Sequence, residues 1–185
     1  MNNKISIIKK IKPFDKILEI EGDKSLSIRW VLLASQAIGK SKSTNLLKSE
    51  DIINALNCIK KLGVKVKLFK NKCEINGVGL NGYKYKKNII LNAGNSGTLG
   101  RLILGLLIHS KKKVKLIGDK SLTNRDFSRI TEPLKKFGAK FYLNKENKLP
   151  LSILGSSFVK PIRYIEDKGS AQCKSSVMLA ALNTK

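Results

Sequence analysis

Hydrophobic residues follow two periods along the first part of the chain, with helical spacing in some segments and alternation in others. Helices are expected where apolar residues recur every three or four positions, and strands where they alternate or form short runs. The elements predicted up to residue 80 are strands at 5–8, 17–20 and 44–47, helices at 30–38 and 49–62, and a hairpin of strands at 64–69 and 73–78. Gly39 and Gly63 are interpreted as the helix ends, because glycine commonly follows a last helical turn.

The same order of elements starts again near residue 89. The elements predicted there are strands at 89–91 and 114–117, helices at 99–108 and 124–137, and a hairpin of strands at 139–143 and 149–154. Lys61-Leu62-Gly63 and Lys136-Phe137-Gly138 are separated by the same interval as Asp51 and Asp126. The pattern therefore predicts an α/β fold with an internal repeat of order β-α-β-α-β-β. A third copy is expected to begin with a strand at 162–165 and a helix at 174–182, and then to be truncated.

Composition excludes several classes of protein. The 185 residues contain no apolar run of about 18 positions, which a membrane-spanning helix needs. The apolar stretch after Met1 is too short for a signal peptide. Cys58, Cys73 and Cys173 are far apart and odd in number, which argues against a disulfide framework and favours a reducing cytoplasm.

The formal net charge is +24, from 37 Lys and Arg against 13 Asp and Glu, which invites a nucleic-acid-binding interpretation. The basic residues are mostly Lys and are spread along the chain, and aromatic residues make up only 6%, which is thin for stacking on bases. A solvated Lys-rich surface is therefore favoured, and a basic nucleic-acid-binding module is kept as the alternative. The five scarce arginines are candidates for bidentate contacts with phosphate or carboxylate, namely Arg29, Arg101, Arg125, Arg129 and Arg163.

Two further patterns are rejected as ligand sites. The G-x-G-x-x-G match at 77–82 is followed by no helical spacing, which a dinucleotide site requires. Gly39-Lys40-Ser41 resembles the end of a phosphate loop, but Ala34 stands where that loop needs glycine. Metal binding has little support, because His109 is the only histidine and the cysteines are isolated.

A stronger pattern is shared by the three repeat starts. Each places serine, with glycine in two cases, at a predicted helix start, and a basic residue follows about one turn later, in 24–29, 95–101 and 169–174. A helix N-terminus offers unpaired N–H groups and a partial positive charge, so it attracts anions. Ordinary capping by serine and threonine is the better explanation of one such start taken alone. With three equivalent starts, anion binding is as good an explanation as capping, and the ligand would then be small and multiply anionic, such as a phosphate ester.

These same residues carry a resemblance to a known family. The segments concerned are 22–29, 45–51, 94–98 with Arg101, 124–126, and 169–175. In this order they resemble the N-terminal portion of the 5-enolpyruvylshikimate-3-phosphate synthase family, the 3-phosphoshikimate 1-carboxyvinyltransferases. Asp126 stands where that family usually has proline. The related family that acts on UDP-N-acetylglucosamine opens with a different motif and is kept as a second alternative.

The resemblance implies a fold of two domains, each built from three β-α-β-α-β-β units, the enolpyruvyl transferase fold. Residues 1–20 would be a strand segment belonging with the second domain, which is missing here. Residues 21–185 would form the substrate-binding domain, with units at about 21–85, 86–157 and 158–185, the last incomplete. On this interpretation the chain is a fragment of an enzyme that is a monomer when complete.

The resemblance also implies transfer of the enolpyruvyl group of phosphoenolpyruvate to the 5-hydroxyl of shikimate 3-phosphate, with release of phosphate. No cofactor or metal, no nucleic acid and no membrane would take part. Carried over by motif, shikimate 3-phosphate would be held by Lys24, Ser25, Arg29, Ser170, Ala171 and Gln172. Phosphoenolpyruvate would be held by Lys24, Gly97, Arg125 and Gln172, with Lys24 as the catalytic residue between the substrates. The chain alone is expected to be inactive.

Overall fold

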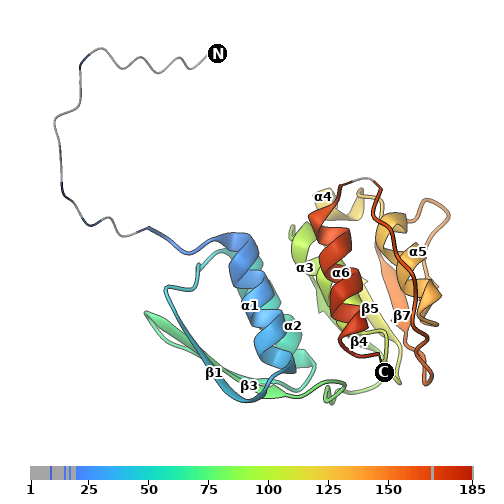
Figure 1. The fold of residues 1–185 in the computed structure, drawn as a ribbon, viewed down its shortest axis with the longest axis horizontal. Coiled ribbons are helices and arrows are strands. Elements are labelled where there is room, and N and C mark those ends of the chain that lie inside the picture. Colours follow the sequence, from blue (N-terminus) through green and yellow to red (C-terminus); the bar gives the residue numbers. More distant parts are fainter. Residues whose placement is uncertain (1–8, 10–14, 16, 18–19, 168, 185) are drawn as a thin grey trace.

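The computed structural model describes residues 9, 15, 17, 20–167 and 169–184, with helices and strands alternating along the chain (Figure 1). In chain order the elements are α1 (Lys24–Gln36), β1 (Ile38–Thr44), α2 (Glu50–Lys61), β2 (Lys65–Leu68), β3 (Lys72–Val78), β4 (Ile89–Asn92), α3 (Gly97–Leu106), β5 (Val114–Ile117), α4 (Lys120–Thr123), α5 (Ser128–Lys136), β6 (Lys140–Tyr142), β7 (Leu151–Leu154) and α6 (Ala171–Ala181). The predicted α/β class is confirmed.

The strands form two sheets with a shared topology. The first has the order β1-β3-β2, with both pairs antiparallel. The second has the order β4-β5-β7-β6, in which β4 and β5 are parallel and the other pairs are antiparallel. Strands β5, β7 and β6 thus repeat the arrangement of β1, β3 and β2. The edge of β5 that β4 covers corresponds to an edge of β1 that has no partner among the described residues.

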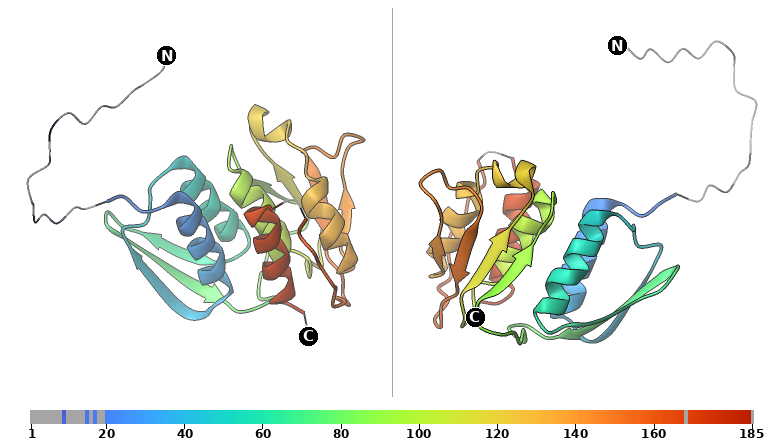
Figure 2. Two further views of the ribbon diagram at one scale, coloured as in Figure 1. Left: turned by 45° about the horizontal axis from the view of Figure 1, so that its top comes forward. Right: turned by 180° about the vertical axis from the view of Figure 1, so that it is seen from behind.

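A single hydrophobic core joins the two sheets and their helices. Helices α1 and α2 lie together on the first sheet, and α6 lies along α3 beside the second (Figures 1 and 2). The core includes Ile28 and Val31 of α1, Ile59 of α2, and Leu102 and Ile103 of α3, all fully or almost fully buried. Helical spacing of its apolar residues explains why α1 turns one face toward the interior, whereas α3 is apolar and buried on nearly all sides.

The first predicted helix and the strand after it are displaced. Helix α1 begins at Lys24, where the carboxylate of Asp23 accepts a hydrogen bond from Leu26 N at 2.7 Å. Gly39 does not end this helix, because it lies within β1 with φ at 89°. The strand predicted at 44–47 is wrong: β1 pairs with β3 from Ile38 opposite Val78 to Thr44 opposite Lys72. This strand is polar, so it forms because it pairs with β3, and no alternation of apolar and polar residues predicts it.

The helix predicted at 124–137 begins at Ser128 instead, after the short helix α4. Phe127 is the N-cap of this helix and has no side-chain cap, while the carboxylate of Asp126 just before it accepts a hydrogen bond from Ser128 N at 2.7 Å, which leaves Arg125 outside the helix. The strand predicted at 162–165 is wrong, since no strand forms there, and α6 begins at Ala171 rather than at Lys174.

The other predicted elements are close to those observed. The helix ending near Gly63, both hairpins, and the strands at 89–91 and 114–117 are confirmed. The strand predicted at 5–8, and half of the one predicted at 17–20, fall outside the described residues. The division at residue 20 and the three unit boundaries therefore stay predictions.

Candidate anion-binding site

Four helices begin close together at one end of the molecule. Helices α1 and α6 both start at the upper end in Figure 1 and are joined where Arg29 Nη2 donates to Ser175 Oγ at 3.0 Å. Helix α6 is joined to α3 where Gln172 Nε2 donates to Thr98 Oγ1 at 3.0 Å. Helix α1 is joined to α2 by the ion pair of Lys24 Nζ and Asp51 Oδ2 at 3.3 Å. Their N-terminal ends add partial positive charge in one region.

Three of these helix starts carry side-chain caps. Asp23 caps α1, the Ser96 hydroxyl accepts from Leu99 N at 3.2 Å, and the Ser170 hydroxyl accepts from Cys173 N at 3.2 Å. The capping interpretation of these serines is therefore correct. A cap satisfies only one of the four unpaired N–H groups in a first turn, so capping and anion binding are compatible.

Two arginine side chains converge over Gly97, the first residue of α3. A Cβ at Gly97 would lie 2.7 Å from Arg101 Nη1 and 2.9 Å from Arg125 Nη1, a space that only glycine leaves open. Arg101 Nη1 donates to Gln172 Oε1 at 2.7 Å, and Arg125 Nη2 donates to Asn95 Oδ1 at 3.3 Å. These contacts leave other guanidinium N–H groups beside the helix start.

Burial and neighbouring positive charge act together at Arg101. Burial is the main cause that lowers the pKa of Arg101, and the charge of Arg125 lowers it further. Within the described residues, no carboxylate lies within ion-pair distance of Arg101 or Arg125. Two like charges held together in this way are favourable when an anion lies between them.

The segment that leads into α6 is held by a carboxylate that the sequence did not single out. Glu166 Oε1 accepts from Ser170 N at 3.3 Å and lies 3.5 Å from Arg129 Nη2 of α5. Its other oxygen accepts the hydroxyl of Tyr164. The scarcity of arginine singled out Arg129, but no signal in the sequence pointed to Glu166 as its partner.

The residues predicted for binding lie in two neighbouring groups. Gly97, Arg125 and Gln172 meet around Arg101, and Arg29 contacts α6 one turn beyond Gln172. Ser25 accepts from Arg29 Nη1 through its carbonyl at 3.1 Å. Lys24 is more than half exposed and forms an ion pair with Asp51. The sequence predicted Asp51 only as a residue at a helix start, not as the partner of Lys24. Ser170 and Ala171 stand at the beginning of α6.

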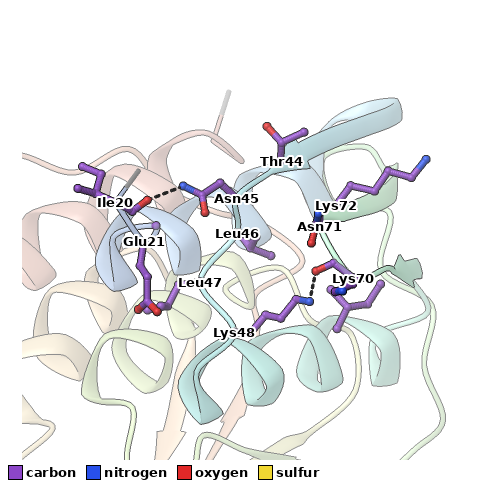
Figure 3. Close-up of a pocket in the computed structure, with 12 residues that line it drawn as sticks. Ile20, Glu21, Thr44, Asn45, Leu46, Leu47, Lys48, Lys70, Asn71 and Lys72 are labelled. Carbon is purple, nitrogen blue, oxygen red and sulfur yellow. Dashed lines mark hydrogen bonds between the residues drawn. The ribbon is translucent and has the colours of Figure 1, made fainter. Parts of the chain in front are cut away.

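A hollow lies elsewhere, away from these helix starts. It has a volume of about 950 Å³ and is bounded by the segment before α1, the loop after β1 and the β2–β3 turn (Figure 3). Asn45 Nδ2 donates to Ile20 O at 2.9 Å across one wall, and Lys48 Nζ donates to Lys70 O across another. None of the eight predicted binding residues lines it. The candidate site is therefore assigned by converging charge and helix starts, not by cavity size.

Metal binding and membrane spanning find no support in the described part of the chain. It holds no group of three or more His, Cys, Asp or Glu side chains arranged to bind a metal ion. None of its helices is long and apolar enough to cross a membrane.

Comparisons with known proteins agree on one family. Residues 8–185 match the family model of EPSP synthase (3-phosphoshikimate 1-carboxyvinyltransferase). The chain is 39% identical over 175 residues to the 3-phosphoshikimate 1-carboxyvinyltransferase of Thermoanaerobacter sp. (strain X514), covering 95% of this chain and 41% of that protein. It is 38% identical over 174 residues to that of Streptococcus pyogenes serotype M2, covering 94% of this chain and 40% of that protein.

A solved structure has the same fold. The EPSP synthase of Acinetobacter baumannii matches with a TM-score of 0.85 at 35% identity, over 91% of this chain and 38% of that one. The chain thus spans 41% or less of each of these three proteins.

Proposed function

Because this chain belongs to the EPSP synthase family, we propose that it supplies the substrate-binding domain of a 3-phosphoshikimate 1-carboxyvinyltransferase. The reaction moves the enolpyruvyl group of phosphoenolpyruvate to the 5-hydroxyl of shikimate 3-phosphate and releases phosphate. The observation that best supports this proposal is the convergence of Arg101 and Arg125 over Gly97, at a helix start that favours an anion.

Shikimate 3-phosphate would lie across the starts of α1 and α6. Arg29 supports this placement because it already joins the two helices through Ser175. Ser25, Ser170, Ala171 and Gln172 would complete the contacts, Ser170 and Ala171 at the first turn of α6. Backbone N–H groups and a guanidinium are the donors that a phosphate ester and a carboxylate accept from.

Phosphoenolpyruvate would lie over Gly97, between the α3 start and Arg125. Lys24 would reach both substrates after leaving its exposed ion pair with Asp51. Such an exposed pair contributes at most about 1 kcal/mol, so an anionic substrate replaces it at little cost. A proton is added to the methylene carbon of phosphoenolpyruvate, and the 5-hydroxyl attacks the cationic carbon and loses its own proton. The tetrahedral intermediate then loses phosphate and one proton of its new methyl group, which restores the carbon–carbon double bond. No step of this proposal calls for a metal or an organic cofactor.

The carboxylates in this region that could act as an acid or base already have other partners. Asp51 pairs with Lys24, and Asp126 accepts from the amide and the hydroxyl of Ser128. We therefore expect weak binding of shikimate 3-phosphate and no turnover by the 185-residue chain alone, with the complete enzyme a cytoplasmic monomer. The buried thiols of Cys58, Cys73 and Cys173 suit a reducing compartment.

Isothermal titration calorimetry of the chain with shikimate 3-phosphate tests this placement. We expect saturable binding that is lost in Arg29→Ala, because the guanidinium is the charged partner at that position. Lys140→Ala, an exposed lysine of β6, serves as the control and should bind like the unmodified chain.

If Arg29→Ala bound shikimate 3-phosphate as tightly as the unmodified chain, this placement of the substrate would be wrong. Tight binding to any polynucleotide, falling steeply with salt, would instead favour the nucleic-acid alternative. Phosphate release from the two substrates by the isolated chain would overturn the expectation of inactivity.

A further inference from the structure

The approach to α6 is an irregular segment that must be held in place. Among the described residues, 155–167 and 169–170 form neither helix nor strand, yet they lead directly into the first turn of α6. Gly169 has φ at 67°, a left-handed conformation that glycine adopts freely, and nothing lies within 4 Å of where its Cβ would be. Local packing at Gly169 therefore contributes little to the orientation of this turn.

Glu166 provides contacts that packing at Gly169 does not. Its side chain is only 7% exposed, although it is a carboxylate, and a buried carboxylate requires partners. Oε1 accepts from Ser170 N and faces Arg129 Nη2, while Oε2 accepts from the hydroxyl of Tyr164. The hydrogen bond to Ser170 N spans Gly169 and fixes the residue that caps α6.

Arg129 extends this connection to the other half of the site. It lies in the first turn of α5, four residues after Arg125, whose guanidinium borders Gly97. The Glu166–Arg129 ion pair therefore ties the start of α6 to the segment that carries Arg125. The carboxylate of Glu166 also balances the positive charge of Arg129. Arg101 and Arg125 then remain as the two arginines available to an anion.

We infer that Glu166 is a positioning residue, which holds Ser170 and Ala171 where shikimate 3-phosphate meets the start of α6. The identity of this ligand rests on the proposed function, whereas the contact between Glu166 and Ser170 does not. Glu166 acts through the Ser170 amide and through Arg129. Its loss should weaken the shikimate 3-phosphate subsite more than the phosphoenolpyruvate subsite, because the Gln172 side chain is held separately by Arg101 and Thr98.

The contact is tested without any ligand by hydrogen exchange at the Ser170 amide, measured by NMR. In Glu166→Ala we expect the protection of this amide to fall about tenfold, because a hydrogen bond to a charged acceptor is lost. Glu166→Gln keeps an acceptor oxygen and should retain most of the protection. Unchanged exchange in Glu166→Ala would overturn the inference.

The consequence for binding is tested with two probes, shikimate 3-phosphate and phosphoenolpyruvate. We expect Glu166→Ala to raise the Kd for shikimate 3-phosphate about tenfold and to change that for phosphoenolpyruvate less than about twofold. Glu166→Gln should recover most of the loss. Glu132→Gln is the matched control, since it removes an exposed carboxylate that pairs with Lys135 on the same helix as Arg129.

Equal weakening of both ligands would show that Glu166 only maintains the fold, and no weakening would show that it positions nothing. If Glu166→Ala does not fold, Arg129→Gln removes the ion pair alone and should still weaken shikimate 3-phosphate selectively. An unmodified chain that binds no shikimate 3-phosphate would contradict the proposed function, and Ser170 exchange would still decide the role of Glu166.

Discussion

Gly97 is the residue at which the α3 backbone and two guanidinium groups approach most closely. The sequence indicated glycine and arginine chemistry near this helix start, because their order and spacing are local features. It did not indicate that Arg101 holds Gln172, since residues 71 positions apart meet only through the packing of α6 on α3. The types of residue in the site were thus predictable, and their partners were not.

Gly97→Ala should weaken phosphoenolpyruvate more than shikimate 3-phosphate. The added methyl group would lie under 3 Å from nitrogen atoms of Arg101 and Arg125, and both side chains would have to move away. Calorimetric titration of each ligand measures the difference. Gly100→Ala on the same helix is the control, because its nearest neighbours are carbon atoms at 3.6 Å. Equal effects of the two substitutions would contradict the assignment of Gly97.

Cys58 and Tyr83 are buried groups that resist ionisation. Burial raises the pKa of Cys58 from 9.0 to about 12 and that of Tyr83 from 10.0 to about 12. When folding raises the pKa of a group, the native state has its full stability at pH values below the pKa of that group in the unfolded chain. This stability is lost as the pH rises toward and through the pKa in the folded chain. The free energy of unfolding should therefore fall between pH 9 and pH 12.

Urea denaturation at successive pH values measures this loss. Tyr83→Phe should lower stability at neutral pH, since the hydrogen bond with Ser35 is lost, but the decline above pH 10 should be shallower. Tyr142→Phe, at a half-exposed ring, should leave the pH profile unchanged. A Tyr83→Phe profile that runs parallel to the unmodified one would exclude Tyr83 as a cause.

At the scale of elements, the prediction succeeded where apolar periodicity was strong and failed where tertiary pairing decides. Helix α2 and the β2–β3 hairpin have clear patterns and were found. Strand β1 consists almost entirely of polar residues and glycine, and it forms because β3 supplies a complete ladder of partners. The start of α5 was misplaced because a turn in which Asp126 accepts from Ser128 N precedes the helix, and a run of helix-compatible residues does not reveal this turn.

The contact between α3 and α6 depends on a glycine. A Cβ at Gly105 would lie 2.2 Å from the backbone oxygen of Ser176, so Gly105→Ala must push the helices apart. We expect a loss of about 1–3 kcal/mol or more in the free energy of unfolding, as for other overpacked cores. Gly100→Ala meets only ordinary contacts and should be neutral or stabilising by up to about 1 kcal/mol. Urea denaturation of both variants tests this pair, and a tolerated Gly105→Ala would contradict the close helix approach.

At the scale of the whole molecule, the excess of positive charge opposes folding. A net charge of +24 on 185 residues brings like charges together in the compact state, and few ion pairs offset them in the described part. Composition alone predicted this balance. It did not reveal that the helices and strands of both sheets share a single core, because that depends on long-range packing.

Added salt should therefore raise the Tm of the chain. Screening shortens the range of repulsion from about 30 Å at 0.01 M to about 10 Å at 0.1 M ionic strength. The double variant Lys86→Glu, Lys87→Glu lowers the net charge at two exposed loop positions and should reduce the rise. Thermal unfolding in sodium chloride measures both slopes. A Tm that falls with salt would show that attractive ion pairs dominate instead.

The side of β1 that has no partner among the described residues has a consequence for encounters between chains. A strand edge with free N–H and C=O groups is a template on which another polypeptide can align, and such edges promote aggregation. Here the strand carries Lys40 and Lys42 on its exposed positions, and Gly39 departs from extended geometry. If the β1 edges of two chains paired, these lysines would repel one another, so pairing of β1 with a second β1 is disfavoured. A segment of opposite charge would not meet this repulsion.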